Sequence, residues 1–122
     1  MKTILVVDDS RIMRNIVKNT FSELKIPCQF LEAENGQKAL KLLEANPISL
    51  ILLDWNMPEM DGMQFLKKVR SMHNYENLPI IMITSESAKY NVVEALQCGA
   101  TDYIVKPIRE KVFMEKISEI EF

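Results

Sequence analysis

The feature that most constrains the fold of this chain is an alternation of short apolar runs with longer segments of helical periodicity. Three of the runs, 4–7, 50–53 and 80–83, consist of Ile, Leu, Val and Met and are bounded by polar or turn residues. Such a short, continuous apolar run is typical of a strand buried on both faces, as in a parallel sheet covered by helices. Two weaker runs, 28–33 and 102–105, bring the expected strands to five.

The segments between the runs carry residues that begin and end helices. Asn35 is a suitable N-cap for the second helix, and Gly99 is well placed to end the fourth. The residues whose spacing marks one face of each of the five helices are Met13, Ile16, Val17, Thr20, Phe21 and Leu24; Ala39, Leu40 and Leu43; Phe65, Leu66 and Val69; Tyr90, Val93 and Leu96; and Val112, Phe113, Ile117 and Ile120. This alternation predicts a doubly wound α/β fold in which residues 1–122 form one domain.

Composition argues against several other classes of protein. A chain of 122 residues buries roughly two-thirds of its unfolded surface, so its fold requires no metal or disulfide. The net charge is -2 and the sequence has no block of Lys and Arg, so nothing in it indicates a basic surface for nucleic acid. No apolar run approaches the ~18 residues of a membrane span. Cys28 and Cys98 lack metal-ligand spacing and are expected to be free thiols in a reducing compartment. We expect a cytoplasmic location and a monomer.

Polar side chains follow the predicted strands at the points where four of them end. They are Asp8 and Asp9 after the first, Asp54 at the end of the third, Thr84 and Ser85 after the fourth, and Lys106 after the fifth. Parallel strands direct their carboxyl ends toward one edge of the sheet, where ligands bind. Three carboxylates, a hydroxyl and one ammonium are therefore expected to converge on one pocket.

This set of groups suits phosphoryl chemistry. Three clustered carboxylates repel one another unless a cation joins them, and oxygen ligands in small number favour Mg²⁺. Asp54 is the best nucleophile, because a buried strand fixes its position, and Lys106 can balance charge on a phosphoryl group. Each signal is weak alone: Asp8-Asp9-Ser10 can be a capping loop, Thr84-Ser85 a turn, and Lys106 a solvated lysine. Their joint placement favours the phosphoryl site.

The same segments resemble the receiver domains of two-component response regulators. The resemblance lies in residues 5–10, 53–62 and 105–107, and Thr84 stands 30 residues after Asp54 and 22 before Lys106, as in that family. It covers the whole chain and implies the flavodoxin-like strand order 2-1-3-4-5. It also suggests a cis peptide bond between Lys106 and Pro107.

The resemblance implies a role for each site residue. Asp54 would be the phosphoacceptor, and Asp9, Asp54 and the backbone carbonyl of Asn56 would ligate Mg²⁺, with Asp8 helping mostly through water. Lys106 would pair with the phosphoryl group and Thr84 would hydrogen-bond it. Tyr103 falls at the position of the family's aromatic switch residue. The chain would then be no enzyme in the usual sense, but a phosphoacceptor that promotes its own phosphorylation and dephosphorylation.

Within the family, the chain is most similar to the chemotaxis regulators. Asn56 and Glu86 match positions that tune the lifetime of the phosphoryl group, and this pair suggests a short-lived signal. The implied partners are a histidine kinase and the flagellar motor switch, with a phosphatase as a further candidate. Binding would occur through the fourth helix, fifth strand and fifth helix. Ser85 and Ile108 depart from common residues near this face, so the partner is less firmly implied than the reaction.

Three other functions remain open from the sequence. A phosphorelay intermediate would favour a slowly decaying phosphate and have little use for an aromatic switch, which Asn56, Glu86 and Tyr103 argue against. A receiver cut from a longer regulator would have the same sequence pattern. A metal-dependent phosphatase with an Asp nucleophile usually carries a second acid two residues later, and here that position is Asn56.

Overall fold

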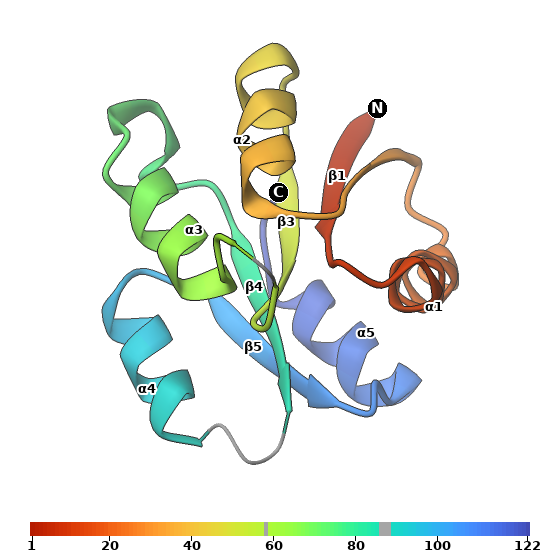
Figure 1. Cartoon of the computed structure of the whole chain (residues 1–122). Helices are drawn as coiled ribbons and strands as arrows, with labels where there is room; N and C mark the ends of the chain where they lie inside the picture. Colours follow the sequence, from red (N-terminus) through yellow and green to blue (C-terminus); the bar gives the residue numbers. More distant parts are fainter. Residues whose placement is uncertain (58, 86–88) are drawn as a thin grey trace.

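A five-stranded parallel sheet forms the centre of the molecule (Figure 1). The computed structural model describes residues 1–57, 59–85 and 89–122. The strands are β1 (Lys2–Val7), β2 (Cys28–Ala33), β3 (Leu50–Asp54), β4 (Ile80–Ser85) and β5 (Asp102–Lys106). Their order is β2-β1-β3-β4-β5, and every neighbouring pair is parallel. The predicted strand order is therefore confirmed.

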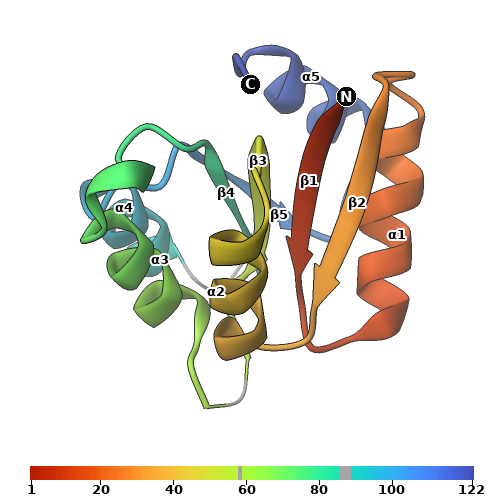
Figure 2. The ribbon, with the colours of Figure 1, turned by 90° about the horizontal axis from the view of Figure 1, so that it is seen from above.

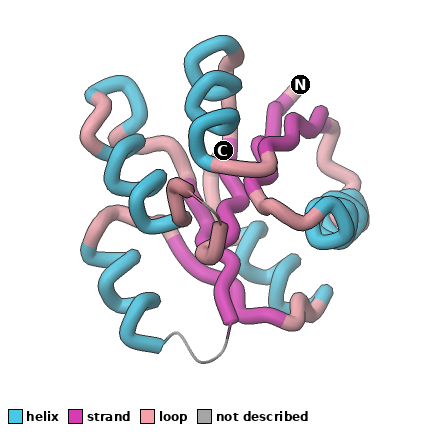
Figure 3. Tube along the Cα trace, in the orientation of Figure 1, coloured by secondary structure: helices cyan, strands magenta, loops and turns pink. Residues whose placement is uncertain are grey.

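Helices cover both faces of the sheet (Figure 2). On one face lie α2 (Gly36–Ala45), α3 (Gly62–Arg70) and α4 (Lys89–Gln97), and on the other lie α1 (Arg11–Ser22) and α5 (Glu110–Ser118). The chain alternates between strand and helix along its length, as the tube view shows (Figure 3). This is the doubly wound α/β architecture that the sequence predicts.

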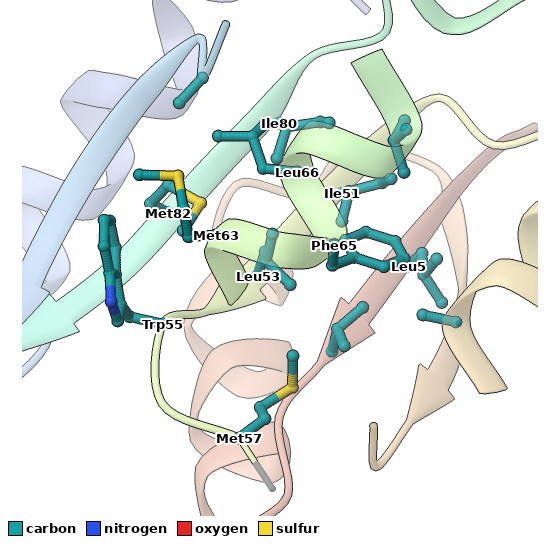
Figure 4. Packing of buried hydrophobic residues seen from close by; sticks show 14 of the residues in the cluster. Leu5, Ile51, Leu53, Trp55, Met57, Met63, Phe65, Leu66, Ile80 and Met82 are labelled. Carbon is teal, nitrogen blue, oxygen red and sulfur yellow. The ribbon is translucent and has the colours of Figure 1, made fainter. Parts of the chain in front are cut away.

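Two apolar cores lie on opposite sides of the sheet. Along β1, Leu5 and Val7 face the core beneath α2 and α3, whereas Ile4 and Val6 face the core beneath α1 and α5. Figure 4 shows the first of these cores, in which Phe65 and Leu66 of α3 pack among strand residues. Because both faces of the central strands are buried, their sequences are continuously apolar rather than alternating.

Several helix ends are defined by specific residues. The Asn35 side chain accepts a bond from the backbone N–H of Lys38, as an N-cap does, at 2.8 Å. Asp61 and Gln64 form a reciprocal capping box at the start of α3. Gly99 has a positive φ of 108° just after α4, a conformation that favours glycine. The predicted roles of Asn35 and Gly99 are confirmed.

The structure departs from the sequence pattern at α4. Among the residues of this helix whose side chains are described, Ala95 is buried, whereas Val93 and Leu96 are 57% and 42% exposed. The helix lies near β5, the strand at one edge of the sheet, and its Ala95 packs into the core beneath α2 and α3. Two of the three apolar residues that mark this helix in the sequence therefore face outward. The side chain of the third, Tyr90, lies outside the described part.

Smaller differences concern element ends and connections. A 3₁₀ helix that the sequence does not predict, His73–Tyr75, connects α3 to β4. Both Thr84 and Lys106 lie inside their strands rather than after them. Cys28 and Cys98 are free, as expected. In the described ranges, we find no helix that combines the length and the apolar character needed to cross a membrane.

Candidate functional site

Strand register brings the predicted site residues to one edge of the sheet. Val7 is level with Leu53, so Asp8, the residue after β1, lies at the same level as Asp54, the last residue of the adjacent strand β3. Asp54 is level with Ile83 of β4, which places Thr84 one residue beyond it. Ser85 is level with Lys106 at the end of β5. The carboxyl ends of four strands therefore meet where the sequence places the pocket.

Three carboxylates gather at this edge. Asp8, Asp9 and Asp54 each offer an oxygen, and these oxygens all lie within 4.8 Å of one another. Asp8 and Asp54 are both 3% exposed, whereas Asp9 is exposed to solvent. Carboxylate oxygens in this number are the donor set of a hard divalent cation such as Mg²⁺, so the chemistry of these residues fits that ion.

The Lys106 ammonium approaches Asp54 from the end of β5. Its Nζ lies 2.8 Å from Oδ1 of Asp54 and forms an ion pair with a carboxylate that is almost completely buried. Burial nonetheless raises the pKa of Asp54 above its usual value, and the charge of Asp9 raises it further. The hydrogen bond and charge of Lys106, together with a bond from the backbone of Asn56, act in the opposite direction.

The pKa of the Asp8 carboxyl is raised as well. Burial is the largest cause and raises the pKa of Asp8 to about 6. A hydrogen bond from the Ser10 backbone lowers this pKa, whereas the negative charges of Asp54 and Asp9 raise it. The amide of Ser10 donates to Oδ1 of Asp8 at 2.8 Å. Two neighbouring negative charges and little water thus make this pocket favourable for added positive charge.

We expect the free energy of unfolding of the metal-free protein to fall as pH rises from about 4 to about 7. The folded-state pKa of Asp8 is raised, so in this range the folded state holds a proton that the unfolded state has lost. Asp8 alone then costs up to about 3 kcal/mol at neutral pH. Denaturant titrations in EDTA at several pH values measure this slope.

In an Asp8→Asn variant, the free energy of unfolding should fall much less with pH, because the asparagine side chain does not titrate. Its amide oxygen can still accept the hydrogen bond from the Ser10 amide. Asp54 supplies the residual slope, since its pKa is also raised. A variant whose unfolding free energy falls with pH as steeply as that of the wild type contradicts the assignment to Asp8.

Gly62 fixes the start of α3 against the end of β3. Its amide donates to the carbonyl of Trp55 at 2.8 Å, and the Trp55 amide donates to Ile83 of β4. A Cβ at position 62 would lie 2.5 Å from the carbonyl oxygen of Asp54, which is closer than atoms can approach. Glycine therefore permits the close packing that holds the Asp54 backbone in place. The sequence pattern does not indicate this role of Gly62, although the residue lies within the matching segment 53–62.

The remaining predicted residues border the carboxylates. Thr84 is buried, and its hydroxyl donates a long hydrogen bond of 3.4 Å to the Ser85 carbonyl. Tyr103 is half-buried, with the Lys116 ammonium 3.8 Å from its ring centre. The Asn56 side chain is exposed beside the pocket, whereas Glu86 lies outside the described residues. The Lys106–Pro107 bond is cis, as the resemblance suggests.

Arg14 on α1 is a residue near the site that the sequence pattern does not single out. Its guanidinium donates to the carbonyl oxygen of Asp8 and to the carboxylate of Glu32. The only local signal is that Arg14 and Lys18 are one helical turn apart on the same helix. Their common partner on β2 becomes visible only in the folded chain.

The fold and its charged edge define a class of protein: doubly wound α/β domains with an acidic pocket at the carboxyl ends of their strands. Comparison with known families narrows this class. Residues 4–118 match the family described as response regulator receiver domain. The chain belongs to this family.

The relatives are chemotaxis proteins. The "Chemotaxis protein CheY homolog" of Campylobacter jejuni is 47% identical over 118 residues, which are 96% of this chain and 90% of the relative. "Chemotaxis protein CheY1" of Helicobacter pylori is 48% identical over 118 residues, or 96% of this chain and 94% of the relative. The solved structure of Vibrio cholerae chemotaxis protein CheY4 is 30% identical, with a TM-score of 0.88 and 99% of both chains covered. The chain is thus a receiver domain similar to CheY.

Proposed function

We propose that this protein is a Mg²⁺-dependent phosphoacceptor that takes a phosphoryl group from a histidine kinase onto Asp54 and signals through a change in partner binding. The observation that carries the proposal is the arrangement around Asp54. A buried carboxylate lies among two further carboxylates, with the Lys106 ammonium 2.8 Å from its oxygen. The similarity to chemotaxis proteins supports the same conclusion.

Asp9 and Asp54 would hold the Mg²⁺ ion directly, with the Asn56 carbonyl, and Asp8 would contribute mostly through water. The proximity of the three carboxylate oxygens supports this ligand set. When bound, the ion supplies positive charge that offsets the carboxylates and the oxygens of a transferring phosphoryl group. The raised pKa of Asp8, which reflects burial and neighbouring negative charge, also favours a cation at this place.

The protein's own residues then carry the transfer. A carboxylate oxygen of Asp54 attacks phosphorus, the bond from phosphorus to the phosphohistidine nitrogen breaks, and its electron pair stays on the imidazole. An acyl phosphate forms on Asp54. Lys106, which pairs with the free carboxylate, then pairs with a phosphoryl oxygen. Asn56 stands where a phosphatase carries its second acid, so we do not propose turnover on other substrates.

The output surface would be the face formed by α4, β5 and α5. A groove of about 620 Å³ lies there, lined by residues that include Val93, Tyr103, Val105, Val112 and Lys116. Val93, Val105 and Val112 are all exposed. An exposed apolar surface rimmed by polar residues is typical of a protein-binding site. The proposed partner is a flagellar motor switch protein, on the strength of the similarity to chemotaxis proteins.

Acetyl phosphate with Mg²⁺ should add one phosphoryl group to the protein, and a chelator should prevent it. Intact-mass spectrometry measures the adduct over time. An Asp9→Ala variant should require at least about tenfold more Mg²⁺, because one of few direct ligands is lost. The proposal fails if no adduct forms, or if the same amount forms in the presence of excess chelator.

A further inference from the structure

Arg14 connects three segments around the acidic pocket. Its Nη1 donates to the carbonyl oxygen of Asp8 at 2.6 Å, and its Nε donates to Oε1 of Glu32 at 2.9 Å. Its side chain is only 12% exposed, although the Glu32 side chain is 35% exposed and this ion pair is open to solvent. One guanidinium on α1 therefore holds both the loop after β1 and the C-terminal part of β2.

The carbonyl that Arg14 binds belongs to the peptide group that joins Asp8 to Asp9. The orientation of this peptide group determines where the chain places Asp9, which is exposed and has no buried surroundings to fix it. On the other side of Asp8, its amide donates to the Ala33 carbonyl at 3.0 Å and continues the β1–β2 ladder. The ladder thus anchors the loop up to the Asp8 amide, and Arg14 anchors the next peptide group.

Glu32 is a charged anchor for the arginine. A hydrogen bond from Lys18 lowers the pKa of Glu32, burial opposes this, and a hydrogen bond from Arg14 lowers the pKa further. Lys18 Nζ lies 2.9 Å from the second carboxylate oxygen of Glu32. The two cations on α1 thus share one carboxylate, and Arg14 also donates to the loop after β1.

We propose that Arg14 is a positioning residue for the metal-binding loop: held by Glu32, it fixes the Asp8–Asp9 peptide group and so pre-organises Asp9 for the cation. The inference rests on the proposed function, because it concerns the same Mg²⁺ site. The effect runs through geometry and not through the charge of Arg14. The charged groups that act on the Asp8 carboxyl are Asp54, Lys106 and Asp9, whereas the charge of Arg14 acts on Glu32 and Glu34.

The test compares Arg14→Met with Lys18→Met. Both variants remove one positive charge from α1 and one partner from Glu32, but only the first releases the Asp8 carbonyl. Calorimetric titration with MgCl₂ should show about tenfold weaker binding for Arg14→Met, the loss typical of an outer-shell partner. Lys18→Met should stay within about twofold of the wild type, since its ion pair is largely at the surface.

Two further variants separate geometry from charge. Arg14→Lys keeps the positive charge, yet a single ammonium cannot reproduce the fork that bridges two acceptors, so it should bind Mg²⁺ almost as weakly as Arg14→Met. Glu32→Gln should weaken binding in the same direction but less. Thermal unfolding in EDTA confirms that each variant is folded, and Arg14→Lys carries the test if Arg14→Met does not fold.

Equal affinities for Arg14→Met and Lys18→Met would overturn the inference, as would full wild-type affinity in Arg14→Lys. A wild-type protein that binds no Mg²⁺ would instead remove the proposed function itself. The two failures are therefore distinguishable in one set of titrations.

Discussion

An Asp54→Asn variant is expected to accept no phosphoryl group from acetyl phosphate or from a phosphorylated histidine kinase. The asparagine amide has nearly the shape of the carboxylate, but it is not a nucleophile toward phosphorus. Its Oδ1 can still accept the hydrogen bond that Lys106 makes to Asp54 at 2.8 Å. The loss should therefore be complete while the fold is kept, and intact-mass spectrometry combined with thermal unfolding measures both.

Lys106→Arg is the matched control for this experiment, because it keeps Asp54 and the positive charge beside it. It should still form the adduct, although a planar guanidinium is a poor substitute for a compact ammonium in this position. An adduct of full stoichiometry on another residue of Asp54→Asn would show that Asp54 is not the acceptor.

A Thr84→Ala variant is expected to become phosphorylated yet lose most of the phosphorylation-dependent gain in partner affinity. Thr84 lies on β4 and Tyr103 on the neighbouring strand β5. Tyr103 is level with Met82, which is two residues before Thr84 on β4. Since side chains alternate along a strand, Thr84 and Tyr103 point to the same face of the sheet. A phosphoryl group on Asp54 offers oxygens to which the Thr84 hydroxyl can turn from its long bond to Ser85.

That movement would free space beside Tyr103 and let its ring turn inward, away from Lys116, which now lies 3.8 Å from the ring centre. The groove that Tyr103 and Lys116 line would then change shape. A coupling between two sites is commonly worth about 1–3 kcal/mol, so the gain in affinity on phosphorylation should be roughly 5- to 150-fold.

The measurement is titration of the proposed partner, a flagellar motor switch protein, with and without acetyl phosphate and Mg²⁺. Thr84→Ser serves as control, because it keeps a hydroxyl at the same place and should retain the gain. Should phosphorylated Thr84→Ala bind as tightly as the phosphorylated wild type, the signal does not pass through Thr84.

The sequence by itself was sufficient to predict the sheet and the composition of its acidic edge. The strands are continuous apolar runs, the N-cap at Asn35 and the glycine at 99 have local chemical causes, and parallel strands necessarily end at a common edge. From these rules alone, Asp8, Asp9, Asp54 and Lys106 could be expected together, and the structure brings them within bonding or ligand distance. The roles of these residues in phosphoryl transfer stay predictions.

Only the tertiary structure decided how the edge is held and which apolar residues are left exposed. Arg14 and Glu32 are 18 residues apart in the chain, and their contact depends on how α1 lies beside β2. The requirement for glycine at position 62 comes from the 2.5 Å approach to the Asp54 carbonyl, which no local pattern reveals. Val93 and Leu96 have apolar side chains like those of the core, but they lie outward because the helix buries Ala95 instead. Periodicity indicates that a helix has an apolar face, whereas the surrounding elements determine whether that face is covered.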